Sequence, residues 1–126
     1  MRTVVIVDDH GTFRAAVREM LERDGFRVVG EADDGATAIE TVRATSPDVV
    51  LVDVHLPGDT DGFAVCEAIA RDGRIGGGHL PALVLTSSHD ASAFRRRLPT
   101  SPARAFIAKA DLAPGALSRL LDGVAT

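Results

Sequence analysis

Short apolar runs alternate along this 126-residue chain with longer segments whose apolar residues recur at helical spacing. Several of the runs are continuously apolar and rich in Val, Ile and Leu, which is typical of strands buried on both faces of a parallel sheet. A sheet with one face in water would instead alternate apolar and polar residues. We therefore expect strands at residues 3–7, 27–32, 49–52, 82–85 and 105–108.

The segments between these runs predict helices. The first helix ends at Gly25 and the second ends before Pro47, because both residue types are typical of helix ends. A short fourth helix is expected near residues 91–98, ended by Pro99. The apolar residues that mark the four longer helices are Phe13, Val17, Met20, Leu21, Ala36, Ile39, Val42, Phe63, Cys66, Ile69, Leu117, Leu120, Leu121 and Val124. Strands that alternate with helices in this way imply a doubly wound α/β sandwich.

Composition argues against several other classes of protein. With 45% hydrophobic and 25% charged residues, the chain has enough apolar material for a core, which argues against a disordered protein. No apolar run approaches the roughly 20 residues of a membrane-spanning helix, and no secretory signal is recognisable. The single cysteine, Cys66, indicates a reducing environment, so we expect a cytoplasmic protein of one domain. The net charge of -4 argues against direct binding of nucleic acid.

Residues with reactive chemistry stand where four of the five predicted strands end. Asp8 and Asp9 end the first strand and Asp53 the third, while Thr86 ends the fourth and Lys109 the fifth. In doubly wound folds, ligands bind beyond the carboxyl ends of the strands, so we expect these side chains to share one edge of the sheet. Lys109 is also the only lysine of the chain. A site that needs a compact cation in a tight space would select lysine, although chance would also explain a single one.

Three carboxylates at one edge of a sheet need positive charge nearby. Two carboxylates about 4 Å apart repel by roughly 4 kcal/mol at an effective dielectric constant near 20. Oxygen ligands with room for water suit Mg²⁺, and the Lys109 ammonium group adds a second positive charge. Carboxylates, a divalent cation, a lysine and the Thr86 hydroxyl together are typical of phosphoryl transfer. Asp53 is the candidate nucleophile, which would form an aspartyl phosphate.

On these residues the sequence resembles the receiver domain of two-component response regulators, over essentially its whole length. The resemblance implies a flavodoxin-like fold, with a five-stranded parallel sheet in the order 2-1-3-4-5 and helices on both faces. Stretches 8–14 and 28–35 are similar to receivers that are usually joined to a helix-turn-helix output domain. The segments that carry the resemblance are Val-Asp-Asp-His at 7–10, Pro-Asp-Val-Val-Leu-Val-Asp at 47–53, Leu-Pro-Gly at 56–58, Asp-Gly-Phe at 61–63, Leu-Thr-Ser at 85–87 and Phe-Ile-Ala-Lys at 106–109.

The resemblance implies how the site would take up phosphate. Asp53 would accept a phosphoryl group from a sensor histidine kinase or a phosphotransfer protein. Asp8 and Asp9 would hold Mg²⁺ or Mn²⁺, together with Asp53 and the backbone carbonyl of His55. Such a protein catalyses only its own phosphoryl transfer and dephosphorylation, so the resemblance predicts a signalling switch rather than a conventional enzyme.

The resemblance also implies how the switch would work. Thr86 and Lys109 would contact the phosphoryl oxygens, and Phe106 stands where the family has a Tyr or Phe that changes rotamer on activation. The surface formed by the fourth helix, the fifth strand and the last helix would then control a downstream protein or form a phosphorylation-dependent homodimer. We expect residues 1–126 to be one receiver domain, with no output domain in the chain and no contact with nucleic acid or membrane.

Some positions depart from the family pattern or have simpler interpretations. Many receivers have a proline after the lysine, but this chain has Ala110, so we expect a trans bond between Lys109 and Ala110. The arginine run at 95–97 is interpreted as a solvated face or as a docking surface for a partner. We expect His10 and His89 at the rim of the site, and neither is predicted to be a metal ligand.

Three other functions are alternatives to a phosphorylated receiver, and a feature of the sequence argues against each. A hydrolase of the haloacid dehalogenase type would need an aspartate two residues after its nucleophile Asp53, where His55 stands. A flavin or nucleotide module would place its phosphate on the loop after the first strand, where Asp8 and Asp9 would repel it. A receiver-like module that works by protein contact alone, without phosphate, is opposed by the complete set of functional residues.

Overall fold

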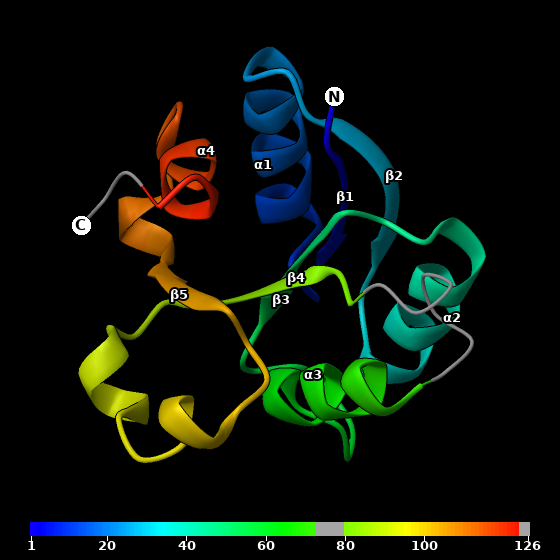
Figure 1. The fold of residues 1–126 in the computed structure, drawn as a ribbon, viewed down its shortest axis with the longest axis vertical. Coiled ribbons are helices and arrows are strands. Elements are labelled where there is room, and N and C mark those ends of the chain that lie inside the picture. Colours follow the sequence, from blue (N-terminus) through cyan, green and yellow to red (C-terminus); the bar gives the residue numbers. More distant parts are fainter. Residues whose placement is uncertain (73–79, 124–126) are drawn as a thin grey trace.

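Five parallel strands form one sheet in the order β2-β1-β3-β4-β5, as predicted. The computed structural model describes residues 1–72 and 80–123. Figure 1 shows α1 and α4 together on one side of the sheet, and α2 and α3 together on the other. The elements are β1 (Thr3–Val7), α1 (Gly11–Arg23), β2 (Arg27–Ala32), α2 (Gly35–Thr45), β3 (Val49–Asp53), α3 (Gly62–Arg71), β4 (Ala82–Ser87), β5 (Ala105–Ala108) and α4 (Ala116–Leu121).

Successive residues of each strand enter two separate hydrophobic cores, because side chains along a strand point alternately to opposite faces of the sheet. Val4 and Ile6 of β1 pack with residues of α1 and α4, whereas Val5 and Val7 pack with residues of α2 and α3. All residues of β3 are buried. Burial on both faces explains why these strands are continuously apolar and therefore visible in the sequence.

The expectation of a fourth helix near residues 91–98 is wrong. The chain there forms two short 3-10 turns, Ala91–Phe94 and Leu98–Thr100. Phe94 is the only buried residue of the first turn and the second turn has none, so neither has the apolar stripe that stabilises a longer helix. Pro99 also lacks the backbone N–H group that a continuing helix would use.

Three smaller predictions concern single positions. No described peptide bond is cis, so the bond between Lys109 and Ala110 is trans, as predicted. Cys66 is fully buried in the core, as its helical spacing indicated, and burial raises the pKa of its thiol to about 12. Val124, expected at the end of the last helix, lies outside the described residues.

Among the helices that are described, none combines the length and the apolar character needed to cross a membrane.

Candidate functional site

The carboxyl ends of β1, β3, β4 and β5 bring the predicted site residues to one edge of the sheet. Asp53 is the last residue of β3 and pairs in register with Thr86 of β4. Asp8 directly follows β1, and Lys109 directly follows β5. These strands are parallel neighbours, so their carboxyl ends meet at the same edge, where this type of fold places its ligands.

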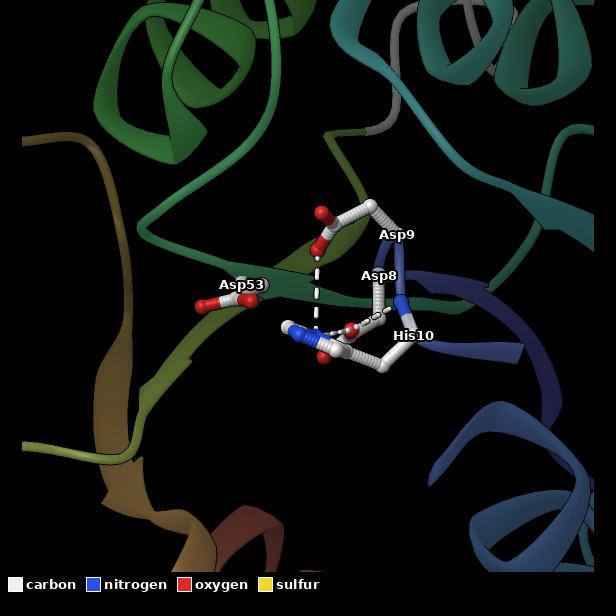
Figure 2. A group of neighbouring side chains, drawn as sticks. All are labelled: Asp8, Asp9, His10 and Asp53. Atoms are coloured by element: carbon white, nitrogen blue, oxygen red, sulfur yellow. Dashed lines mark hydrogen bonds and ion pairs between the residues drawn. The ribbon is translucent and has the colours of Figure 1, made fainter. Parts of the chain in front are cut away.

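Three carboxylates and one imidazole form a tight cluster at this edge (Figure 2). One potential ligand atom from each of Asp8, Asp9, His10 and Asp53 lies within 4.8 Å of the others. Asp8 and Asp53 are buried, whereas Asp9 and His10 are exposed. We expected His10 only at the rim, but its Nδ1 lies 3.0 Å from Asp8 Oδ1 and 3.1 Å from Asp9 Oδ1. The imidazole is therefore part of the cluster.

Lys109 supplies positive charge to this cluster. Its Nζ lies 2.7 Å from Asp8 Oδ2 and 3.3 Å from Asp53 Oδ2, and its side chain is only 17% exposed. Burial alone would lower the pKa of Lys109, but the two carboxylates outweigh this effect and hold the pKa above its ordinary value. The lysine is therefore charged in the folded protein near neutral pH.

The two buried carboxyl groups have pKa values shifted in opposite directions. Burial raises the pKa of Asp53, and the negative charge of Asp8 adds to this rise. Asp8 is buried as well, but its ion pair with Lys109 and the hydrogen bond from the backbone N–H of His10 outweigh burial and lower its pKa. Asp53 is therefore the less stabilised of the two carboxylates, and it would gain more from a cation bound nearby.

The cluster has the chemistry of a site for a hard divalent cation. When all groups are ionised, its three carboxylates outnumber the single Lys109 ammonium group and leave an excess of negative charge. Carboxylate oxygens are the ligands that Mg²⁺ and Mn²⁺ prefer. The backbone N–H of His55, whose carbonyl we expect to be a further ligand, donates to Asp53 Oδ1 at 3.2 Å. The residues present therefore fit the predicted metal.

Thr86 adds a buried hydroxyl group beside Asp53. The residue is 1% exposed, and its Oγ1 has no hydrogen-bond partner within the described part of the chain. A buried hydroxyl without a partner costs about 1–3 kcal/mol, so folded proteins contain few of them. Thr86 therefore keeps unused hydrogen-bonding capacity beside Asp53.

A row of neighbouring aromatic rings connects the rim of the site to the surface near β5. The rings of His55 and His89 are 5.5 Å apart, and both lie near the ring of Phe94, at centroid distances of 5.8 and 6.5 Å. Phe94 in turn lies 5.8 Å from Phe106, the predicted switch residue, which is half-buried. Our reading of the sequence missed Phe94. The sequence feature that could have identified Phe94 is that no other large apolar residue occurs between β4 and Leu98.

The three consecutive arginines have different environments. Arg95 and Arg96 are exposed, as a solvated or docking surface would be. Arg97 instead reaches the start of α3, where its guanidinium carbon lies 4.0 Å from the centroid of the Phe63 ring. Its Nη2 also lies 3.1 Å from Asp61 Oδ2. Arg97 therefore ties the 3-10 turns to α3.

A network of ion pairs on α1 holds the end of β1. Arg14 Nη1 donates to the backbone carbonyl of Asp8, and Arg14 Nε donates to Glu31 Oε1 at 3.1 Å. Arg18 Nη1 donates to the other carboxylate oxygen of Glu31 at 2.8 Å. The hydrogen bond from Arg18, aided by Arg14, holds the pKa of Glu31 below its ordinary value. Glu31 thus supports the backbone from which Asp8 extends.

We expect Glu31→Gln to lower the free energy of unfolding by about 1 kcal/mol near neutral pH, because partly exposed ion pairs are individually weak. A carboxyl group with a lowered folded-state pKa stabilises the fold above its unfolded pKa, and this contribution is lost as the pH falls through the folded pKa. The difference from wild type should therefore begin to shrink as the pH falls below the ordinary glutamate pKa of about 4.3, and it should disappear below the folded-state pKa. Urea unfolding over a pH series measures it, with the exposed Glu40→Gln as the control. A difference that does not change with pH would contradict the expectation.

Comparison with known proteins identifies the family. Residues 4–121, nearly the whole chain, match the family model of the response regulator receiver domain. The chain belongs to this family, as its motifs indicated, and its sheet order and acidic cluster agree with that assignment.

Individual relatives are bacterial transcriptional regulators. The chain is 38% identical over 121 residues to the transcriptional regulatory protein NarL of Mycobacterium tuberculosis, a match that covers 94% of this chain and 53% of that protein. It is 38% identical over 107 residues to the virulence regulator BvgA of Bordetella pertussis, with 84% of this chain and 48% of BvgA covered. The chain therefore spans about half the length of these two relatives.

Solved structures give the same relationship. The signal receiver domain of M. tuberculosis NarL superposes with a TM-score of 0.81 at 36% identity, covering 98% of this chain and 96% of that one. A LuxR-family two-component response regulator from Aurantimonas sp. SI85-9A1 superposes with a TM-score of 0.79 at 28% identity, covering 98% and 84%. The chain is thus a receiver related to NarL and LuxR-family regulators.

Proposed function

We propose that this receiver is a phosphorylation-activated switch with Asp53 as the phosphoacceptor. The observation that carries this proposal is the setting of Asp53, a buried carboxylate with Lys109 Nζ at 3.3 Å and the unbonded Thr86 hydroxyl on the adjoining strand. The other buried carboxylate, Asp8, is held more tightly: its Oδ1 accepts from a backbone N–H at 2.8 Å and its Oδ2 lies 2.7 Å from Lys109 Nζ, against 3.2 and 3.3 Å for the matching contacts of Asp53. Asp53 is therefore the better placed nucleophile.

In the proposed transfer, a carboxylate oxygen of Asp53 attacks the phosphorus of a phosphohistidine on a sensor kinase or phosphotransfer protein. A P–O bond forms as the P–N bond breaks, and the departing imidazole nitrogen keeps the electron pair and takes up a proton. Asp8, Asp9, Asp53 and the backbone carbonyl of His55 would hold Mg²⁺ or Mn²⁺, which would neutralise charge on the phosphoryl oxygens. The protein would catalyse only this transfer and the later hydrolysis of its own aspartyl phosphate.

Two residues are proposed to hold the transferred group. A phosphoryl group carries about -1.5 to -2 charges near neutral pH, more than the carboxylate that it modifies. The Lys109 ammonium group faces the Asp53 carboxylate in this structure. After phosphorylation it would bind a phosphoryl oxygen instead of that carboxylate. The Thr86 hydroxyl, which has no hydrogen-bond partner among the described residues, would donate to another phosphoryl oxygen. This bond would remove the free-energy cost of a buried unpaired hydroxyl.

Phosphorylation is further proposed to change the surface formed by the two 3-10 turns, β5 and α4. Movement of Thr86 toward the phosphoryl group would leave space for Phe106, and Phe106 contacts Phe94 of the first turn. Shifting such an equilibrium from 1:99 to 99:1 needs roughly 5.5 kcal/mol of differential stabilisation. Several new charge-assisted hydrogen bonds are large enough to supply this.

The proposed partners follow from this scheme. A sensor histidine kinase or phosphotransfer protein would supply the phosphoryl group to this receiver in the cytoplasm. A downstream protein, an output domain or a second copy of the chain would read the changed surface. The names of the relatives support an output in gene regulation, while the net charge of -4 argues that this chain does not itself contact nucleic acid.

Incubation with acetyl phosphate and Mg²⁺, followed by intact-mass measurement, tests the proposal. We expect wild type and the exposed-loop control Asp59→Ala to gain one phosphoryl group, and Asp53→Ala to gain none. Amide NMR spectra of the same samples should change most at the 3-10 turns, β5 and α4. Binding of Mg²⁺ without any mass gain would favour a receiver that works by protein contact alone.

A further inference from the structure

The Lys109 ammonium group lies over the face of the Phe13 ring. The distance from Lys109 Nζ to the ring centroid is 4.2 Å, within the roughly 6 Å over which an aromatic face attracts a cation. Phe13 belongs to the first turn of α1 and is half-buried, packed against the core shared by α1, α4 and the sheet. Sequence periodicity assigned Phe13 only to that core, so its contact with the site is a finding of the structure.

We propose that Phe13 is a positioning residue for phosphoryl transfer, whose ring holds the Lys109 ammonium group at the edge of the acidic cluster. The proposal rests on the function proposed above for Asp53 and adds to it a residue outside the strand ends. Lysine needs such help because its ammonium group stands at the end of a flexible four-carbon stem. An ammonium group that is already in place loses less conformational freedom when it binds a phosphoryl oxygen.

The ring holds the lysine in a different way from the carboxylates. Asp8 and Asp53 attract the ammonium group by opposite charge, at 2.7 and 3.3 Å. That attraction weakens when a bound cation offsets the charge of the carboxylates, as the Mg²⁺ of the proposed function would. The Phe13 ring attracts the cation through its quadrupole and carries no net charge. The ring therefore holds the ammonium group in place whether or not a cation offsets the charge of the carboxylates. The full charge of the ammonium group stays available to a phosphoryl oxygen.

A purely structural role for Phe13 predicts different behaviour. If the ring only fills the core between α1 and the sheet, leucine at this position should serve nearly as well, since it is apolar and the lost volume lies at a half-buried position. A role in positioning depends on the aromatic face, so tyrosine should replace phenylalanine and leucine should not. The pair Phe13→Leu and Phe13→Tyr therefore separates the two roles.

The chain's single lysine allows the contact to be observed directly. In protein labelled with ¹³C only in lysine, the side-chain methylene next to the ammonium group gives a single NMR signal. We expect ring current from Phe13 to shift this signal upfield in wild type and in Phe13→Tyr. In Phe13→Leu, the signal should move toward the position of free lysine. This measurement needs no phosphorylation and so does not depend on the proposed function.

Phosphorylation kinetics then test the positioning role. With acetyl phosphate and saturating Mg²⁺, we expect Phe13→Leu to react about three- to tenfold more slowly than wild type, and Phe13→Tyr to stay within about twofold. Val17→Ala, at a buried position one turn further along α1, controls for lost packing and should keep the wild-type rate. Thermal unfolding of all variants shows whether stability accounts for any difference.

Each outcome decides between the hypotheses. A slower Phe13→Leu, with a moved lysine signal and rescue by tyrosine, would support the proposal. Wild-type rates in Phe13→Leu, or an equal loss in Val17→Ala, would overturn the role of Phe13 while leaving Asp53 as the phosphoacceptor. If wild type itself takes up no phosphoryl group, the proposed function fails, and the positioning role fails with it even if the lysine signal shows the ring contact.

Discussion

A Lys109→Met variant should lose about 3 kcal/mol of its free energy of unfolding near pH 7.5. The Lys109 ammonium group faces two buried carboxylates, at 2.7 Å from Asp8 Oδ2 and 3.3 Å from Asp53 Oδ2. Without it, both carboxylates must take up a proton or draw water into the site, and either change costs free energy. The loss is expected to be large because one partner of a buried group of charges is removed while the others stay behind.

The same variant should lose much less stability near pH 5. Carboxyl groups without a counterion have folded-state pKa values above those of the unfolded chain, so the folded state takes up protons as the pH falls. Urea unfolding followed by circular dichroism measures both conditions, with the exposed Arg27→Met as the control. Adding Asp53→Asn to the variant should restore part of the loss. A loss that is equal at both pH values would show that packing, and not charge, is responsible.

Gly62→Ala should lower the free energy of unfolding by about 2–3 kcal/mol and slow phosphorylation as well. Gly62 begins α3, directly against the end of β3, and its backbone N–H donates to the Val54 carbonyl at 2.8 Å. An added Cβ would lie 2.8 Å from the Val54 Cα and closer still to the carbonyl oxygen of Asp53. Both neighbours are backbone atoms, so α3 or the end of β3 must move.

Thermal unfolding and the rate of reaction with acetyl phosphate measure these two effects. Gly11→Ala is a matched control, because Gly11 is also the first residue of a helix beside the site. Its added Cβ would meet only a side-chain nitrogen of Arg14, at 3.7 Å. Wild-type stability in Gly62→Ala would show that α3 can retreat from β3 without cost. Normal phosphorylation in a destabilised Gly62→Ala would show that Asp53 is not displaced.

The sheet and the acidic site could be predicted because each leaves a local signal. A strand buried on both faces must be apolar throughout, which is how β3 stands out in the sequence. A parallel sheet then brings the strand ends together, so Asp8, Asp53 and Lys109 could be placed at one edge without knowledge of any distance. Register did not have to be known, since the residues directly after the strands carry the chemistry.

Contacts between distant surfaces left no such signal. Phe13 carries the spacing of an ordinary core residue, and only the packing of α1 near the end of β5 brings its ring to Lys109. Arg97 stands in a run of charge that is typical of a solvated surface, yet it lies against Phe63 of α3. The fourth helix was expected because strands and helices alternate along the rest of the chain. The segment has only one buried residue in its first turn, Phe94, which is too little to stabilise a longer helix.

The weak anchoring of the 3-10 turns affects which parts of the molecule can open independently. Phe94 is their one buried residue, and the contact of Arg97 with α3 lies at the surface. Segments with few buried apolar contacts unfold locally at free energies well below that of global unfolding. The two cores on either side of the sheet can therefore stay intact while residues 91–101 exchange between conformations. If Asp53 is phosphorylated as proposed, a modest free-energy change there would be enough to alter the conformation of this segment without unfolding either core.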